Sequence, residues 1–350
     1  MEDMLLFIKK YPEMLIDARE LTKKAKLPSY ESGKDYTKIL VCGMGGSAIG
    51  GDLLKNLLRN AEFSTAFKVG VEVSRQYKPP SNIDEKTLVF CVSYSGNTEE
   101  TLSQFVHARK NGCKMIALTS DGKLKNWCDR LGVPFVELPT EFKPRVALPY
   151  LFVPLMEYVV GEKVEKDFEE AVKVLDTIRL DEKETENIKR IASMLKDHRI
   201  VVYGLAEFEA VVRRAKTQIN ENSKLPASWA VFPELCHNDI VGYEDNDLNK
   251  DVYVLMLRDE EVEKDDAIRV RIETTLEIIR PKVKGVVEIR SFGKSFLARM
   301  MSFLYYVDLL SYYIARESGK IPEKTDNIDK LKATLKEKVN LQDKLEKELT

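Results

Sequence analysis

The stretch Leu88-Val-Phe-Cys-Val-Ser-Tyr-Ser-Gly-Asn-Thr-Glu-Glu-Thr101 passes from one kind of secondary structure to another within fourteen residues. Its apolar start predicts a strand over Leu88–Ser93 that is buried on both faces, as in parallel sheets. Ser, Gly and Asn then predict a tight turn, and a helical pattern follows over Glu99–Lys110. A buried strand that leads through a turn into a helix is the building unit of a doubly wound α/β sheet.

Similar units recur on both sides of this stretch. In the first half of the chain we expect further strands over Ile39–Cys42, Lys68–Val73, Met115–Thr119 and Phe135–Leu138. In the second half we expect strands over Ile200–Tyr203, Trp229–Phe232, Val252–Leu257 and Val286–Ile289, and long helices over Glu260–Ile279 and Ser295–Arg316. The sequence therefore predicts two parallel-sheet domains in tandem.

The two halves also repeat one another. Ile39-Leu-Val-Cys-Gly43 aligns with Ile200-Val-Val-Tyr-Gly204, and a second pair of apolar runs follows about fifty residues later in each half. The copies differ after their strands, where the first half has Gly and Ser but the second has Leu205-Ala-Glu and Arg258-Asp-Glu. We expect only the first half to bind an anion.

The same patterns predict five parts of the chain. They are an N-terminal helical segment over 1–36, a first α/β domain over 37–150, a helical bridge over 151–190, a second α/β domain over 191–325 and a C-terminal helix over 326–350.

Charge and cysteine content exclude several classes of function. Lys+Arg 55 against Asp+Glu 57 leaves a net charge of only -2, so we expect no nucleic-acid partner and no anionic membrane surface. Five scattered cysteines, an odd number, indicate free thiols and a reducing, cytoplasmic location. The apolar run after Met1 is too short for a signal peptide, and no window approaches the roughly 18 apolar residues of a spanning helix.

The first candidate loop is Gly43-Met-Gly-Gly-Ser-Ala-Ile-Gly-Gly51, between a strand and a helix expected from about Asp52. Gly45 and Gly46 would let the backbone approach an anion, and Ser47 adds a hydroxyl donor. The same glycines also fit a dinucleotide fingerprint, which needs an acidic residue at the end of the next strand. That strand instead ends in Val-Ser-Arg, which disfavours the dinucleotide interpretation.

The second loop distinguishes these interpretations. Ser93, Ser95 and Thr98 place three hydroxyl groups around the start of a helix, and both loops lie at the carboxyl edge of one sheet, where open α/β sheets bind ligands. Hydroxyls and a helix dipole suit a phosphate dianion, and no P-loop lysine follows either loop. The alternative is that Thr98 only caps its helix and the serines only fill a turn.

Both loops, together with Glu234-Leu-Cys-His-Asn-Asp239, resemble the bifunctional phosphoglucose/phosphomannose isomerase family, over about residues 36 to 335. The resemblance implies two flavodoxin-like sugar-isomerase (SIS) domains and a homodimer in which a neighbouring subunit contributes a histidine to the active site. It implies interconversion of glucose 6-phosphate, mannose 6-phosphate and fructose 6-phosphate with no metal and no cofactor.

The resemblance also assigns residues by motif. Gly45, Gly46, Ser47, Ser93, Ser95 and Thr98 would hold the phosphate. Glu221 would be the base, His237 the ring opener and Arg145 the cation beside the reacting carbons. Thr325 and Lys332 would complete the site, Thr325 near C2 and Lys332 beside the histidine.

Aldose–ketose isomerisation needs such a set, because it moves a proton between C1 and C2 through a cis-enediol and requires a base, a ring opener and a cation. Each residue also has a structural interpretation: Glu221 could end a solvated helix, Arg145 could pair with Glu141, and Lys332 is one lysine among many. His237 lies in a polar loop after an apolar strand, a common place for a functional histidine. Three scattered histidines and no CxxC pair make a poor metal-ligand set.

Two other functions remain open at this point. A non-catalytic SIS module that senses sugar phosphates would keep both loops without needing Glu221 or His237. An SIS enzyme for a different sugar phosphate would keep the fold and change the substrate.

Overall fold

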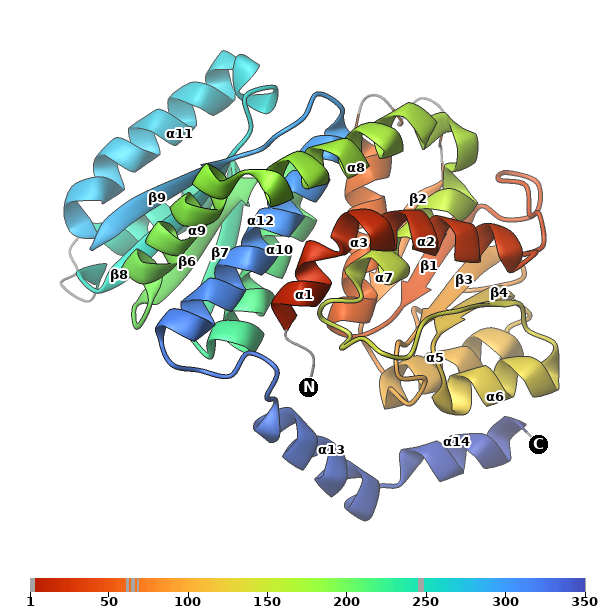
Figure 1. The fold of residues 1–350 in the computed structure, drawn as a ribbon. Coiled ribbons are helices and arrows are strands. Elements are labelled where there is room, and N and C mark those ends of the chain that lie inside the picture. The colour runs from red at the N-terminus through yellow and green to blue at the C-terminus, as the bar shows by residue number, and fades with distance from the viewer. Residues whose placement is uncertain (1–3, 61–62, 64–66, 68, 245–248, 350) are drawn as a thin grey trace. The chain divides into compact units, whose positions relative to one another are not determined.

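The computed structural model describes residues 4–60, 63, 67, 69–244 and 249–349 (Figure 1). They form two compact units. The five-stranded unit comprises Glu13–Val164 and Thr325–Thr350, and the four-stranded unit comprises Met1–Pro12 and Glu165–Lys324.

All strands of the five-stranded unit are parallel, in the order β2-β1-β3-β4-β5. Their bounds are β1 (Lys38–Cys42), β2 (Gly70–Ser74), β3 (Thr87–Val92), β4 (Lys114–Thr119) and β5 (Phe135–Glu137). The predicted parallel, doubly wound sheet is thus confirmed. The strand expected over Lys68–Val73 is observed as Gly70–Ser74; Lys68 itself lies outside the described residues. β2 is partly exposed because it is an edge strand.

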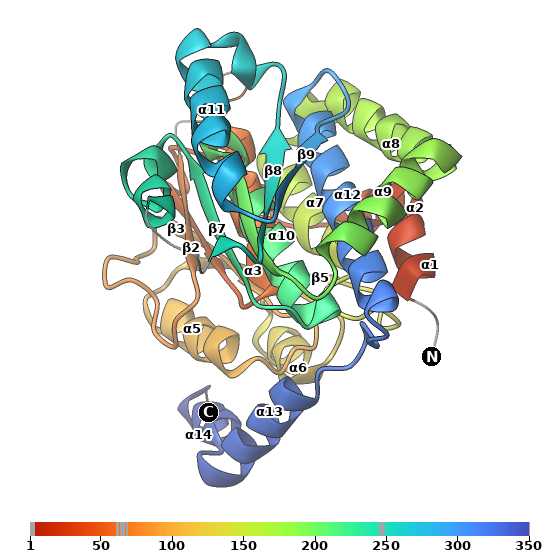
Figure 2. The same cartoon turned by 90° about the vertical axis from the view of Figure 1, so that its left-hand side faces the viewer.

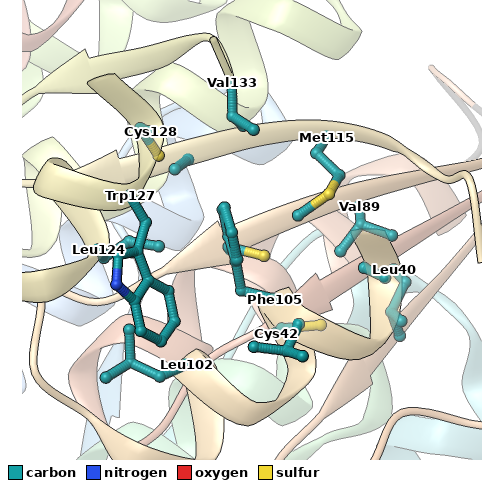
Figure 3. Close-up of a cluster of buried hydrophobic side chains, with 14 of the residues drawn as sticks. Leu40, Cys42, Val89, Leu102, Phe105, Met115, Leu124, Trp127, Cys128 and Val133 are labelled. Atoms are coloured by element: carbon teal, nitrogen blue, oxygen red, sulfur yellow. The ribbon is translucent and has the colours of Figure 1, made fainter. Parts of the chain in front are cut away.

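Helices cover both faces of this sheet. They are α3 (Gly46–Arg59), α5 (Glu99–Lys110), α6 (Gly122–Leu131) and α7 (Leu148–Val159), with α2 (Tyr11–Lys24) beginning in the other unit. One core cluster lies under α5 and α6, where Phe105 and Trp127 pack with ring centroids 5.7 Å apart, beside Cys42 and Cys128 (Figure 3). Burial of such aromatic surface is the main force that fixes these helices on the sheet.

Two predicted helix boundaries need correction. The helix expected from about Asp52 begins at Gly46, so Gly50 and Gly51 lie inside α3. A Cβ at Gly50 would lie 2.2 Å from the carbonyl oxygen of Leu151, and one at Gly51 would lie 2.8 Å from the Val41 side chain. These two glycines therefore allow close packing of α3 on α7 and β1 and do not serve an anion.

The predicted helical C-terminus is present as two helices, α13 (Asp326–Lys338) and α14 (Leu341–Leu349). Asn340 has φ 46, a left-handed conformation that ends α13. The Asn340 side-chain amide donates to Asp343 at 2.7 Å in the first turn of α14. The sequence pattern predicted one helix here because Lys and Glu continue on both sides of the break, and Asn340 is the only residue nearby that favours the end of a helix.

The four-stranded unit repeats the same order, β7-β6-β8-β9, with all strands parallel. The strands are β6 (Arg199–Leu205), β7 (Ala227–Phe232), β8 (Val252–Arg258) and β9 (Gly285–Arg290). The helices are α1 (Met4–Lys9), α8 (Glu165–Leu180), α9 (Glu182–Leu195), α10 (Glu209–Gln218), α11 (Asp266–Ile279) and α12 (Phe296–Glu317). Figure 2 shows α11 and α12 on opposite sides of this sheet. None of the helices in the described ranges is long and apolar enough to cross a membrane.

Capping side chains set the starts of the two long helices in this unit. The helix expected from Glu260 begins at Asp266, because the Asp265 carboxylate accepts from the backbone N–H groups of Ala267 and Ile268. The Ser295 hydroxyl accepts from the N–H of Ala298, so α12 begins one residue later than predicted.

A buried ion pair links α10 to α12 in the four-stranded unit. The Arg214 guanidinium donates to both carboxylate oxygens of Asp308 at 3.1 and 2.6 Å. Tyr11 and Gln218 also donate to Asp308, at 2.6 and 2.9 Å. Because all four side chains are buried, burial raises the pKa of the Tyr11 hydroxyl well above its ordinary value, and it stays a neutral donor.

We expect Asp308→Ala to lower the free energy of unfolding by about 3–5 kcal/mol, because it leaves the Arg214 charge buried without its partner. Denaturant titration measures this change. The matched control is Asp266→Ala, which removes an exposed Asp–Arg pair with Arg269 and should cost less than about 1 kcal/mol. Equal losses in the two variants would show that Asp308 is not an anchor of this unit.

Candidate active site

Both predicted loops lie where the order of the five-stranded sheet reverses. β1 and β3 are direct neighbours, with Cys42 opposite Cys91, and each is followed by one of the loops. The next strands in sequence then add on opposite sides, β2 beside β1 and β4 beside β3. Such a switch point is where doubly wound sheets bind their ligands.

Three of the predicted hydroxyl residues are held together by hydrogen bonds. The Ser47 hydroxyl accepts from the backbone N–H of Tyr94 at 3.3 Å, which joins the first loop to the second. The Ser93 hydroxyl donates to Thr98 Oγ1 at 3.0 Å and accepts from the Thr98 N–H at 3.4 Å. Ser95 is exposed beside them, and its hydroxyl accepts from the N–H of Asn97 at 3.4 Å.

Both helices that start here lack a side-chain cap. The N-cap residue of α3 is Gly45, which has no side chain, and the N-cap Thr98 of α5 makes no capping hydrogen bond with its own side chain. The structure thus differs from the alternative in which Thr98 serves α5 as a cap. Without a side-chain cap, the positive end of each helix dipole is available to a bound anion.

Glycine is required in the second loop. Gly96 has φ +66, and a Cβ there would lie 1.6 Å from the carbonyl oxygen of Asp121. In the first loop Gly45 has φ +51, and a Cβ at Gly46 would lie 2.9 Å from the carbonyl oxygen of Pro144. This close approach brings the residue that follows Pro144, Arg145, next to the first loop, and its side chain is buried.

Tyr94 is a site residue that the sequence analysis missed. It lies between two of the candidate serines, is buried, and donates its hydroxyl hydrogen to the carbonyl of Pro139. The same hydroxyl accepts from the N–H of Phe142 at 2.9 Å. Burial raises the Tyr94 pKa to about 12, so the group stays protonated. Tyr94 therefore ties the second loop to the segment that leads to Arg145. In the sequence, the position of Tyr94 between Ser93 and Ser95 was the only indication of such a role.

Glu221 lies in the four-stranded unit, in a π-helical turn over Ile219–Ser223 that follows α10. Its neighbours in the turn are anchored to α12: the Asn222 amide donates to the Ser311 hydroxyl at 3.0 Å, and the Ser223 hydroxyl donates to the Ser311 carbonyl at 2.8 Å. Glu221 itself is half-buried. Single π-helical turns are rare and often mark functional positions, so this one differs from a solvated helix end.

Lys224 ends this turn in a left-handed conformation, with φ 58. Its ammonium group donates to the carbonyl of Glu221, to that of Lys324 at 2.7 Å and to that of Pro322 at 3.2 Å. The turn that carries Glu221 is therefore fixed to the segment immediately before Thr325. Lys224 is a second positioning residue that sequence reasoning missed.

His237 is exposed in a short 3-10 turn, Glu234–His237, just after β7. Glu221 comes before β7 and His237 after it, and a six-residue strand spans about 20 Å. The two side chains therefore lie at opposite ends of the same strand. The acidic residues near His237 contact other groups: Glu234 accepts from Asn238, and Asp239 accepts from Tyr203.

Thr325 and Lys332 lie on α13, in the five-stranded unit. Thr325 is the N-cap residue of this helix, and its hydroxyl donates to Asp329 at 3.3 Å. Lys332 is exposed on the middle of the helix. The described part of the chain contains no group of three or more His, Cys, Asp and Glu side chains that could hold a metal ion.

Two further observations bear on the alternatives. β2 ends at Ser74, and the next residue, Arg75, pairs with Asp52, so the place of a ribose-binding carboxylate is taken by a cation. In the four-stranded unit, Arg258 at the end of β8 donates to Glu263 at 3.0 Å and to Glu288 at 2.8 Å. The strand end that matches the second loop thus carries internal ion pairs.

We expect Gly96→Ala to abolish saturable binding of fructose 6-phosphate, measured by calorimetry, because the new methyl group must displace the loop. Gly112→Ala is the matched control: Gly112 has φ +67, and a Cβ there meets nothing within 4 Å. Both variants should lose about 1–2 kcal/mol of stability from the left-handed conformation. Unchanged binding in Gly96→Ala would remove the second loop from the site.

Comparison with known proteins places this geometry in a family. Residues 34–126 match the SIS domain model, and residues 184–335 match the model of the bacterial phospho-glucose isomerase C-terminal SIS domain. A hypothetical protein from Thermus thermophilus shares the fold, with TM-score 0.74 at 17% identity over 97% of this chain and 91% of that chain.

Two relatives are named bifunctional phosphoglucose/phosphomannose isomerase. The one from Caldicellulosiruptor bescii is 40% identical over 337 residues, which cover 93% of this chain and 97% of the relative. The one from Aquifex aeolicus is 33% identical over 86% of this chain and 91% of the relative. The chain described above belongs to the bifunctional phosphoglucose/phosphomannose isomerase family.

Proposed function

We propose that this protein is a metal-independent isomerase that converts glucose 6-phosphate and mannose 6-phosphate to fructose 6-phosphate, and back, through a cis-enediol. The observation that carries the proposal is the pair of uncapped helix starts joined by Ser47, Ser93 and Thr98 at the switch point. Two helix ends and several hydroxyls suit a phosphate dianion on a small sugar. The family of the chain supports the same substrate class.

Glu221 is the base in this proposal. It removes the proton from C2 of the open-chain aldose and returns it to C1, which gives the ketose. The reverse transfer from the other face of the same enediol gives mannose 6-phosphate, so one base serves both aldoses. The π-helical turn supports this role because the hydrogen bonds of Asn222 and Ser223 to α12 fix the backbone beside the base, and a fixed base needs little reorganisation.

Arg145 supplies the positive charge that stabilises the enediolate oxygen. Its segment is held against the first loop by the contact of Gly46 with Pro144 and by the Tyr94 hydroxyl. Thr325 has a small side chain, which leaves room for the enediol to rotate about its C2–C3 bond and present its other face to the base. Lys332 assists ring opening together with a histidine.

We propose a homodimer in which that histidine, His237, comes from the second copy. The support is the position of the two residues around β7: Glu221 comes before the start of this strand and His237 after its end, and a six-residue strand spans about 20 Å, more than the size of one sugar phosphate. A symmetric dimer supplies the missing group to each site from its partner. We also place the enzyme in the reducing cytoplasm, in keeping with its five free cysteines.

We expect purified protein to form fructose 6-phosphate from both aldose phosphates, with no loss of rate in EDTA, in an assay coupled to fructose 6-phosphate consumption. Glu221→Gln should lower kcat by at least about 100-fold and leave KM within about threefold, because it removes the base and keeps the shape. Glu169→Gln, at an exposed position on α8 of the same unit, is the control, since it makes the same chemical change and leaves Glu221 in place. Turnover that EDTA abolishes would contradict the mechanism, and an active Glu221→Gln variant would reassign the base.

Co-expression of Glu221→Gln and His237→Asn chains tests the shared site. Each variant alone should be nearly inactive, whereas every mixed dimer keeps one intact site of two, so isolated mixed dimers should have about half the wild-type specific activity. The readout is specific activity after isolation of mixed dimers through two different affinity tags. Mixed dimers without activity would place both groups in one chain.

A further inference from the structure

The last helix of the chain, α14, packs on the five-stranded unit over α5 and α6, as both views of the fold show (Figures 1 and 2). Leu345 is only 3% exposed and belongs to the same core cluster as Trp127 and Phe105. Leu341 and Leu349, one turn away on either side, pack against that cluster. This spacing gives α14 a continuous apolar face, so it is a docked element of the unit.

Polar contacts fix the orientation of α14. Glu346 accepts from the Trp127 indole N–H at 2.5 Å and pairs with Arg130 at 2.6 Å. Burial alone would raise the pKa of Glu346, but the contacts with Trp127 and Arg130 hold it below its ordinary value, so the carboxylate stays charged. At the far end of the helix Glu348 pairs with Lys110 of α5 at 2.6 Å. The helix is therefore held in one register on α5 and α6.

The near end of α14 contacts the second loop of the active site. The Gln342 side-chain amide donates to the carbonyl oxygen of Asn97 at 2.9 Å. Asn97 is itself a bridge: its side-chain amide donates to the Ser95 carbonyl at 3.0 Å, and its side-chain oxygen accepts from the N–H of Lys123 at 3.1 Å. Because the Asn97 N–H also donates to the Ser95 hydroxyl, Gln342 adds a fourth hydrogen bond to Asn97, the residue just before Thr98.

We propose that α14 positions the phosphate-binding loop, with Gln342 as the positioning residue. Substrate affinity would then depend on a helix outside both matched domain models, which end at residues 126 and 335. This inference rests on the proposed function of the loop. Because Gln342 holds a backbone carbonyl at the start of α5, it fixes the direction of the N–H groups and hydroxyls that meet the phosphate. Gln342 acts on the loop proposed to hold the phosphate and not on the proposed base, so we expect its effect to fall on binding and not on proton transfer.

The test is Gln342→Met in the full chain, which keeps the shape of the side chain and removes its donor without adding charge. We expect KM for fructose 6-phosphate and the inhibition constant of inorganic phosphate to rise about three- to tenfold, the size of one lost hydrogen bond, with kcat unchanged. Lys110→Met is the matched control, because it breaks one polar contact of the same helix at the end away from the loop. Its KM should match the wild type.

The outcomes separate this inference from the proposed function. If the wild type isomerises hexose phosphates and Gln342→Met leaves both constants unchanged, α14 has no positioning role and the inference is overturned, while the proposed function stands. Equal rises in KM for Gln342→Met and Lys110→Met would also overturn it, since docking alone would then explain the effect. A wild type that binds no hexose phosphate, measured by calorimetry, overturns the proposed function itself.

Discussion

The adjacency of β1 and β3 is the constraint on which the rest of the candidate site depends. Two parallel neighbours end at the same edge, and since the following strands add on opposite sides, α3 and α5 both start there with no element between them. The hydrogen bond from the Tyr94 N–H to Ser47 closes the gap between the two starts. In the proposed site, two helix dipoles and several hydroxyls would take the place of the lysine that other phosphate sites use.

The four-stranded unit has different chemistry at the corresponding strand end. At the end of β8, Arg258 is almost surrounded by Glu263, Glu273 and Glu288, and Asp259 accepts from Arg299 at 2.9 Å. In these ion pairs the charges of Arg258 and Asp259, at the carboxyl end of β8, are neutralised by side chains of the same unit. The polar groups at the end of β8 are thus satisfied by other residues of the same unit, whereas the proposed phosphate site lies at the ends of β1 and β3.

Sequence patterns predicted the strands within one or two residues, because short apolar runs of Val, Ile and Leu separated by turn residues have few alternatives. The loops at Ser47 and at Ser93 followed from those strands. Positions that depend on tertiary packing were missed. Gly50 and Gly51 lie inside α3 and allow it to pack against α7 and β1, but in the sequence these glycines look like part of a flexible loop. Tyr94 and Lys224 act through backbone carbonyls and amides of distant segments, and no local pattern encodes those partners.

Neither compact unit is one continuous piece of chain. Residues 1–12 belong with Glu165–Lys324, and Thr325–Thr350 belong with Glu13–Val164. During synthesis the hydrogen bond from Tyr11 to Asp308 can form only after almost three hundred further residues have been made. The core around Trp127 is likewise complete only when Leu345 has left the ribosome. A chain divided near Val164 would therefore give two fragments that each carry a terminal segment of the other unit and lack their own.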